Sequence, residues 1–128
     1  MMKKILFISL MLLMGIGYAS AQGKADIKFD KVSHDFGKFS VKEPIQEYTF
    51  TFTNVGDAPL VINQAVASCG CTVPTYTKTP IAPGQKGSIK VTYNGTGKMT
   101  GTFKKSITVR TNAISEMTRL YVEGEMTD

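Results

Sequence analysis

The sequence is poor in the residues on which most small catalytic and metal-binding domains depend. In 128 residues it has no tryptophan, one histidine and two cysteines. Two cysteines are too few for a disulfide-dense scaffold, and a closed zinc site needs four ligands. The chain also lacks a glycine-rich phosphate loop of the Walker type and is too short for two independent cores. These absences exclude a multidomain enzyme and a structural zinc protein, and we expect no cofactor.

The charge is mildly basic, with 15 basic and 10 acidic residues and a net charge of +5. The lysines of the C-terminal half are spread among apolar residues rather than gathered with arginines on one segment. Nucleic-acid binding needs clustered basic groups, an aromatic platform or a recognition helix. The pattern predicts a solvated surface and no nucleic-acid partner.

Residues 1–21 have the pattern of a cleavable signal peptide. Two lysines precede an apolar run over 5–16, and a small-x-small cleavage site follows at 19–21. Neither cysteine lies near this site, so a lipid-modified N-terminal cysteine is excluded. We therefore expect cleavage to release a soluble domain, residues 22–128, that is periplasmic or secreted and is not inserted in a membrane.

The apolar residues of 22–128 alternate with period two, which predicts strands rather than helices. The clearest strand is Gln46 to Thr53, in which Tyr48, Phe50 and Phe52 share one face. Similar alternation predicts further strands at 27–36, 60–67, 72–76, 88–93, 103–109 and 119–126.

About seven strands at this spacing are typical of an all-β, Ig-like antiparallel β-sandwich. Two stacked sheets bury both inner faces, whereas one sheet leaves an apolar face in water. Lys105 has the parity of the inward residues of its strand, which predicts either a position at the rim or a bulge that resets the alternation. The predicted core consists of Tyr48, Phe50, Phe52, Ile62, Ile89, Val91, Ile107 and Val109, with Leu120 and Val122 from the last strand.

Two segments carry a resemblance to a known family: Ser68-Cys69-Gly70-Cys71-Thr72-Val73-Pro74, and Pro80-Ile81-Ala82-Pro83-Gly84 with the strand after it. With these segments the chain resembles the bacterial Ig-like family called domain of unknown function 1573. More distantly it is similar to major-sperm-protein and cilium-associated Ig-like domains, which are binding modules. The resemblance implies an Ig-like fold, an envelope location and an unassigned activity. The Cys-Gly-Cys-Thr element is its most specific part.

The two cysteines, Cys69 and Cys71, are separated by one residue. In an extended strand their Cα atoms would lie about 6.6 Å apart, close to the upper limit of ~6.8 Å for a disulfide, so the backbone must contract. Gly70 permits a tight turn there. A disulfide that closes a loop of this size stabilises the folded state by only about 1.6 kcal/mol, so it would contribute little to stability and would be comparatively easy to reduce. Because the compartment is oxidising, we predict an intramolecular Cys69–Cys71 disulfide.

Three interpretations of this element stay open at the level of sequence. In the first, the cysteines close a strand, with or without a bridge. In the second, they hold a soft metal such as Cu(I), with Met99 and His34 as further candidate ligands. In the third, they exchange disulfides with a partner, although the Cys-x-x-Cys at a helix N-terminus that lowers a thiol pKa is missing.

The sequence favours a non-enzymatic binding or assembly module of the bacterial envelope, which recognises its partner through loops or an exposed strand edge. The partner is expected to be another envelope protein or a cell-surface component. The competing hypothesis is a redox or Cu(I)-binding protein, and thiol-disulfide exchange is the only reaction that the residues suggest. The candidate site consists of Cys69, Gly70 and Cys71, with Thr72 and Pro74 shaping the loop and Pro83 and Gly84 presenting a neighbouring type II turn.

Overall fold

The computed structural model describes residues 23–128, so the predicted signal peptide and its cleavage site lie outside the described residues. These residues form strands joined by turns and contain no helix that is long and apolar enough to cross a membrane. The strands are β1 (Ile27–Phe29), β2 (Ser33–Ser40), β3 (Ile45–Asn54), β4 (Ile62–Ala67), β5 (Thr72–Tyr76), β6 (Lys86–Asn94), β7 (Gly101–Thr111) and β8 (Met117–Thr127).

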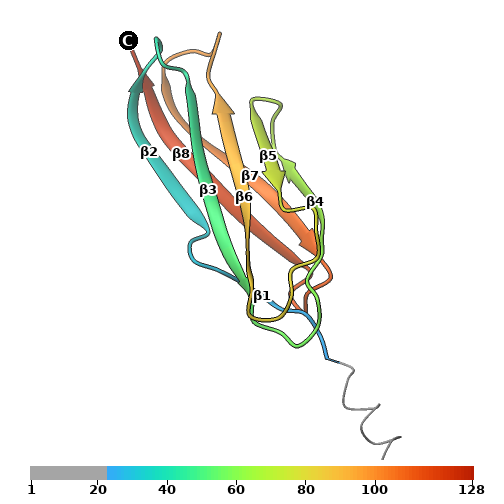
Figure 1. Ribbon diagram of the computed structural model, residues 1–128. Coiled ribbons are helices and arrows are strands. Elements are labelled where there is room, and N and C mark those ends of the chain that lie inside the picture. Colours follow the sequence, from blue (N-terminus) through green and yellow to red (C-terminus); the bar gives the residue numbers. More distant parts are fainter. Residues whose placement is uncertain (1–22) are drawn as a thin grey trace, which may run out of the picture.

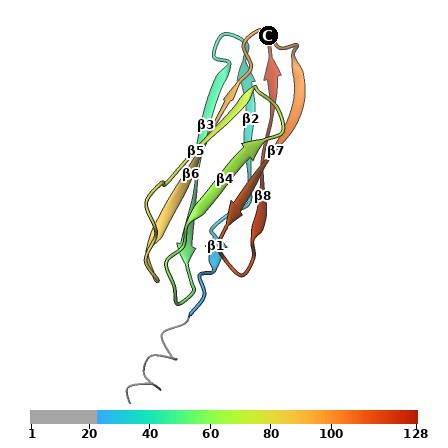
Figure 2. The same ribbon diagram turned by 90° about the vertical axis from the view of Figure 1, so that its right-hand side faces the viewer.

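The strands form two four-stranded sheets, with the orders β1-β3-β6-β5 and β2-β8-β7-β4. This confirms the predicted all-β, Ig-like sandwich. Figure 1 shows β2 and β3 at one side of the sandwich and β4 and β5 at the other, and Figure 2 views the side formed by β4 and β5. All pairs are antiparallel except β2 with β8, which is parallel.

The single N-terminal strand predicted over 27–36 is wrong in one respect, because the structure divides it into β1 and β2 and places them in different sheets. Ile27 and Phe29 pack against the core from one sheet, and Phe36 packs against it from the other. The inward residues are therefore odd-numbered before the break and even-numbered after it. A continuous strand cannot change parity without a bulge, so the chain crosses between the sheets instead.

The core lies between the two sheets and contains the residues that alternation predicts, with one difference. Phe52, Ile89 and Val91 are completely buried, as are their counterparts in the opposite sheet, Ile107, Val109, Leu120 and Val122. Tyr48 is only partly buried, and its ring stacks on that of His34 from β2. Alternating aromatic and β-branched side chains on two facing sheets thus supply the burial that the fold requires.

Asn54, at the end of β3, is fully buried and holds two turns against each other. Its side-chain oxygen accepts from Gly56 N at 3.0 Å, and its Nδ2 donates to Ala58 O at 2.8 Å and to Ile81 O at 2.9 Å. A buried amide with all its groups paired specifies one local geometry, because any other leaves polar atoms without partners. Asn54 therefore fixes how β3 ends and β4 begins.

Candidate functional site

The Cys-Gly-Cys element connects β4 to β5, so it carries the chain from one sheet to the other. Cys69 and Cys71 are joined by a disulfide, with Cα atoms 5.3 Å apart. Thr72 N donates to Cys69 O at 3.2 Å, and this turn supplies the contraction that the spacing demands. The element is tied to β6 by Asn94 N, which donates to Cys71 O at 2.8 Å.

The two sulfur atoms have different surroundings. Cys69 Sγ accepts a hydrogen bond from Cys71 N at 3.1 Å, whereas Cys71 Sγ lies 3.7 Å from the hydroxyl of Thr72. Thr72 is buried and both cysteines are half-buried. Gly70, between them, is exposed, and a Cβ built there meets no atom within 4 Å. Gly70 does not have a positive φ, so the backbone conformation does not require glycine at this position. Its lack of a side chain leaves the tip of the element uncovered.

The structure does not bring together all of the residues that the sequence groups with the cysteines. Thr72 and Pro74 lie in β5 beside the element. Pro83 and Gly84 form the predicted turn, in which Gln85 N donates to Ala82 O at 3.0 Å and Gly84 has φ of 82°. This turn precedes β6, whereas the cysteines are tied to the far end of that strand, so it is not a neighbour of the Cys-Gly-Cys element.

The structure decides between the two positions that the sequence predicted for Lys105. The β7–β8 register runs without a shift through this residue, so no bulge resets the alternation and the side chain keeps its inward parity. It is half-buried. The β4–β7 ladder ends with the pair Ala67 and Ile107, and Ser68 N still donates to Ser106 O at 2.9 Å, so the residues that follow next on the two segments are Cys69 and Lys105. A lysine at an inward position of its strand was visible in the sequence. Its nearness to the cysteines became apparent only from the pairing of β4 with β7.

The outer edge of β3 is a second candidate site, which the sequence did not reveal. β1 pairs only with the last three residues of β3. Asp30 N donates to Thr51 O at 3.0 Å, which shows that odd-numbered residues of β3 turn their backbone groups towards the β1 side. Beyond the end of β1, no strand in the described part of the chain pairs with this edge. The backbone groups presented there belong to Ile45, Glu47 and Thr49.

The other sheet edges each carry a feature that discourages strand pairing. β5 contains Pro74, and the hydrogen bonds of Cys71 and Thr77 with β6 show that even-numbered residues face its free edge, where proline has no donor. β2 is broken by a register shift at Gly37, which has φ of 70°. β4 is short and contains a register shift after Ile62. β3 is longer and has a continuous register with β6.

Aromatic side chains of β2 and β3 pack against one another at the side of the sandwich that these two strands form (Figure 1). The rings of His34 and Tyr48 are stacked with centroids 3.8 Å apart, and Phe36 and Phe50 meet them edge-on. Burial lowers the pKa of His34 below its usual 6.5; Lys31 adds to this effect and Asp35 opposes it. His34 is therefore neutral at physiological pH and serves as part of an apolar surface.

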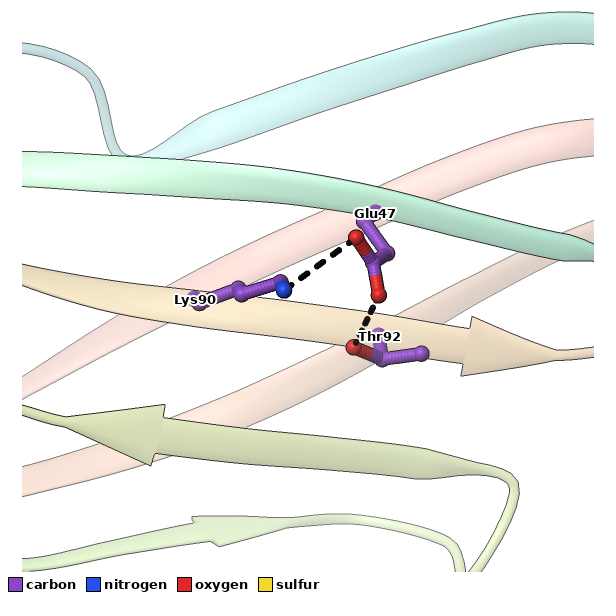
Figure 3. Close-up of polar contacts among 3 residues, drawn as sticks. All are labelled: Glu47, Lys90 and Thr92. Atoms are coloured by element: carbon purple, nitrogen blue, oxygen red, sulfur yellow. Dashed lines mark hydrogen bonds and ion pairs between the residues drawn. The ribbon is translucent and has the colours of Figure 1, made fainter.

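The outer face of the sheet beside the β3 edge is polar, and the carboxylate of Glu47 on this face points towards β6 and away from the edge. Glu47 lies 3.3 Å from Lys90 Nζ and accepts a hydrogen bond from Thr92 at 3.4 Å. Figure 3 shows the Glu47 side chain reaching from β3 over β6 to both partners. An exposed pair of this kind stabilises little, but it holds the carboxylate over the sheet and leaves the β3 backbone accessible.

An open hollow of about 400 Å³ lies over β2, β8 and β7, above Gly37 and Gly124. Asp35, Glu123 and Glu125 line it together with a lysine. Among the described residues, no group of three or more His, Cys, Asp or Glu side chains is arranged to hold a metal ion. His34 is also remote from the cysteines in the sheet order, because β8 and β7 separate its strand from β4.

A family model for a protein of unknown function, DUF1573, matches residues 27–126. The chain belongs to this family. The match covers both candidate sites and confirms the resemblance drawn from the Cys-Gly-Cys-Thr element. A comparison with curated proteins found no match.

Solved structures similar to this DUF1573 chain share its fold. A protein of unknown function from Porphyromonas gingivalis W83 aligns with a TM-score of 0.67 and 16% identity, over 79% of this chain and 46% of that protein. A PapD-like domain of human CEP192 aligns with a TM-score of 0.65 and 9% identity, over 82% and 87% of the two chains. The YadV chaperone aligns with a TM-score of 0.56 and 17% identity, over 80% and 53%. These likenesses confirm the Ig-like, PapD-like sandwich, and this chain spans less than half of the Porphyromonas protein.

Proposed function

We propose that this DUF1573 domain is an exported, non-enzymatic binding module of the bacterial envelope, and that it holds an extended segment of another envelope protein as an added strand on the free edge of β3. The observation that carries the proposal is the edge itself. Ile45, Glu47 and Thr49 present backbone donors and acceptors that no described strand pairs with. An added strand satisfies these groups in the way that β-augmentation does elsewhere.

The surroundings of the edge indicate the chemistry of the added segment. Ile45 is 55% exposed, and the half-buried rings of His34 and Tyr48 stack on each other between β2 and β3. Alternate side chains of an added strand would cover these rings, and the residues between them would lie beside Thr49 on the polar face. We therefore expect a segment of about six residues, roughly 20 Å long, in which large apolar and polar residues alternate.

Export rests on the sequence of residues 1–21, which has the basic, apolar and small-residue regions of a signal peptide. The neighbouring folds are compatible with a binding role, because one is a chaperone and another is a PapD-like domain of a larger protein. In this proposal the partner is an envelope protein and not a nucleic acid, since the lysines of the C-terminal half are spread along the sequence and are not clustered as nucleic-acid binding requires.

The proposal is tested by photo-cross-linking in cells that express the full chain. Ile45 is replaced by benzoylphenylalanine, and the cross-linked peptide is identified by mass spectrometry. A matched probe replaces Val66, which is 48% exposed on β4 at the opposite side of the sandwich. We expect the Ile45 probe to capture one segment of an envelope protein with alternating apolar residues, and the Val66 probe to capture none.

A backbone variant shows whether strand pairing is responsible. Thr49→Pro removes a donor that faces the free edge and leaves the hydrogen bonds to β6 intact, so the domain should fold. Losing that hydrogen bond and adding the pyrrolidine ring should reduce cross-linking about ten-fold. Thr49→Val keeps the donor and should have little effect. No product at position 45, capture of a second copy of the chain, or equal yields with Thr49→Pro and Thr49→Val would each contradict the proposal.

A further inference from the structure

The Cys-Gly-Cys element lies at the side of the sandwich opposite the β3 edge, and the binding function does not use it. Its disulfide is carried by a connection between sheets rather than by the core. Gly70 at its tip is exposed and has open space around its Cβ position, so no neighbouring side chain covers that tip. An accessible disulfide in a short loop can be attacked by a thiolate from another molecule.

The two sulfurs are not equivalent as leaving groups. Cys69 Sγ accepts the backbone N–H of Cys71 at 3.1 Å, a contact that stabilises negative charge on Cys69 once the bond breaks. Only the Thr72 hydroxyl approaches Cys71 Sγ, at the longer distance of 3.7 Å. A thiol of lower pKa leaves faster, so this asymmetry favours release of Cys69.

Lys105 reinforces the asymmetry. Ser68 N donates to Ser106 O at 2.9 Å, which extends the contact of the two strands one residue beyond the β4–β7 ladder, and the residues that follow are Cys69 and Lys105. Lys105 has the inward parity of its neighbour Ile107 and is half-buried, and its strand lies next to β4, from which the Cys-Gly-Cys element continues.

We infer that Cys69–Cys71 is a thiol-disulfide exchange site, in which Cys71 Sγ is attacked and Cys69 leaves as a thiolate held by Cys71 N–H and Lys105. A thiolate of a partner dithiol attacks Cys71 Sγ, the Cys69–Cys71 bond breaks, and its electron pair remains on Cys69 Sγ. The partner's second thiolate then attacks the mixed disulfide and releases Cys71. The partner dithiol is thereby oxidised to a disulfide, and Cys69 and Cys71 are reduced to two thiols.

The first test locates the attacked sulfur, with reduced glutathione as the attacking thiol. The oxidised protein is incubated with glutathione for increasing times, and excess N-ethylmaleimide is then added to each sample to block the free thiols. The modified peptide is sequenced by tandem mass spectrometry. The inference predicts glutathione on Cys71 and N-ethylmaleimide on Cys69 in the earliest samples. Glutathione mainly on Cys69, equal amounts on both residues, or a disulfide that glutathione does not open would overturn it.

The second test isolates the positioning role of Lys105 by measuring the rate of this reduction in folded variants. A neighbouring cation lowers a pKa by about one unit or more, and one unit in a leaving thiol changes the rate about three-fold. Lys105→Gln should therefore slow reduction of the disulfide by glutathione about three-fold or more, whereas Lys105→Arg, which keeps the positive charge, should retain the wild-type rate. The matched control is Lys104→Gln, because Lys104 is exposed and lies over the ring of Tyr121. Equal rates for Lys105→Gln and Lys104→Gln would remove Lys105 from the mechanism.

Both tests are independent of the β3 edge. Thr49→Pro should leave the glutathione rate unchanged, and Cys69→Ala should leave cross-linking from position 45 unchanged. Failure of the exchange reaction therefore does not bear on strand binding, and failure of strand binding does not bear on exchange.

Discussion

Replacing Asn54 by alanine tests how much of the fold depends on one buried amide. The substitution leaves Gly56 N–H, Ala58 C=O and the longer contact of Asp26 N–H at 3.4 Å without the side-chain partner. Ile81 C=O still accepts from Leu60 N at 2.8 Å. Each buried polar group left unpaired costs about 1 to 3 kcal/mol. Asn54→Ala should therefore lower the free energy of unfolding by about 2 to 4 kcal/mol, a large part of the stability of a domain of this size.

Asn112 provides a matched control, because it directly follows β7 and binds a turn through its side chain. Its Oδ1 accepts from Val61 N at 2.8 Å and its Nδ2 donates to Pro59 O at 3.1 Å, but the residue is exposed, so water can replace it. Asn112→Ala should cost only about 0.5 to 1 kcal/mol.

Urea denaturation followed by circular dichroism measures the difference between these two variants. At an m value of about 2 kcal/mol/M, the midpoint should fall by about 1 to 2 M for Asn54→Ala and by less than about 0.5 M for Asn112→Ala. Asn54→Asp retains the size but turns an oxygen towards two carbonyl groups, so it should not restore stability. If the two alanine variants lose the same stability, burial of the Asn54 network is not what fixes this end of the sandwich.

Three further outcomes follow from the contacts described above. Gly87→Ala should lower stability by about 1 to 3 kcal/mol, because its Cβ would lie 2.5 Å from the Phe52 ring, whereas Gly70→Ala, in open space, should change it by less than about 0.5 kcal/mol in the same urea assay. Because the pKa of His34 is lowered in the folded protein, the unfolded chain binds the proton more readily, and stability should fall as pH drops through 6.5. His34→Phe should reduce this pH dependence of the urea midpoint, measured from about pH 8 to about pH 5. Intact mass spectrometry of the purified protein after alkylation under native, non-reducing conditions should show no adducts, whereas two adducts would contradict the disulfide.

Alternation along the sequence was sufficient to predict the strands that have one buried face. β3, β6 and β7 each have a sustained period of two, and the side chains predicted to face inward are buried or partly buried. The break between β1 and β2 also left a local signal, since inward parity changes from Phe29 to Phe36. Periodicity predicts which face a strand buries because burial acts on each side chain separately.

The sequence did not predict which strands pair, and both candidate sites depend on pairing. The β3 edge is free because β1 ends early and β2 joins the opposite sheet. Lys105 has a relation to Cys69 only through the register of β4 with β7. The separation of the Pro83–Gly84 turn from the cysteines likewise follows from the length of β6 between them. Such relations join residues far apart in the chain, and local patterns carry little information about them.

The measurement that tests the binding account most directly is amide hydrogen exchange along β3, in the free protein and with a synthetic peptide of the segment captured from position 45. In the free protein, Glu47 and Thr49 should exchange quickly, whereas Gln46, Tyr48 and Phe50, whose amides face β6, should exchange slowly. Adding the peptide should protect Glu47 and Thr49. Slow exchange at both residues before the peptide is added, or fast exchange at both in its presence, would contradict strand addition at this edge.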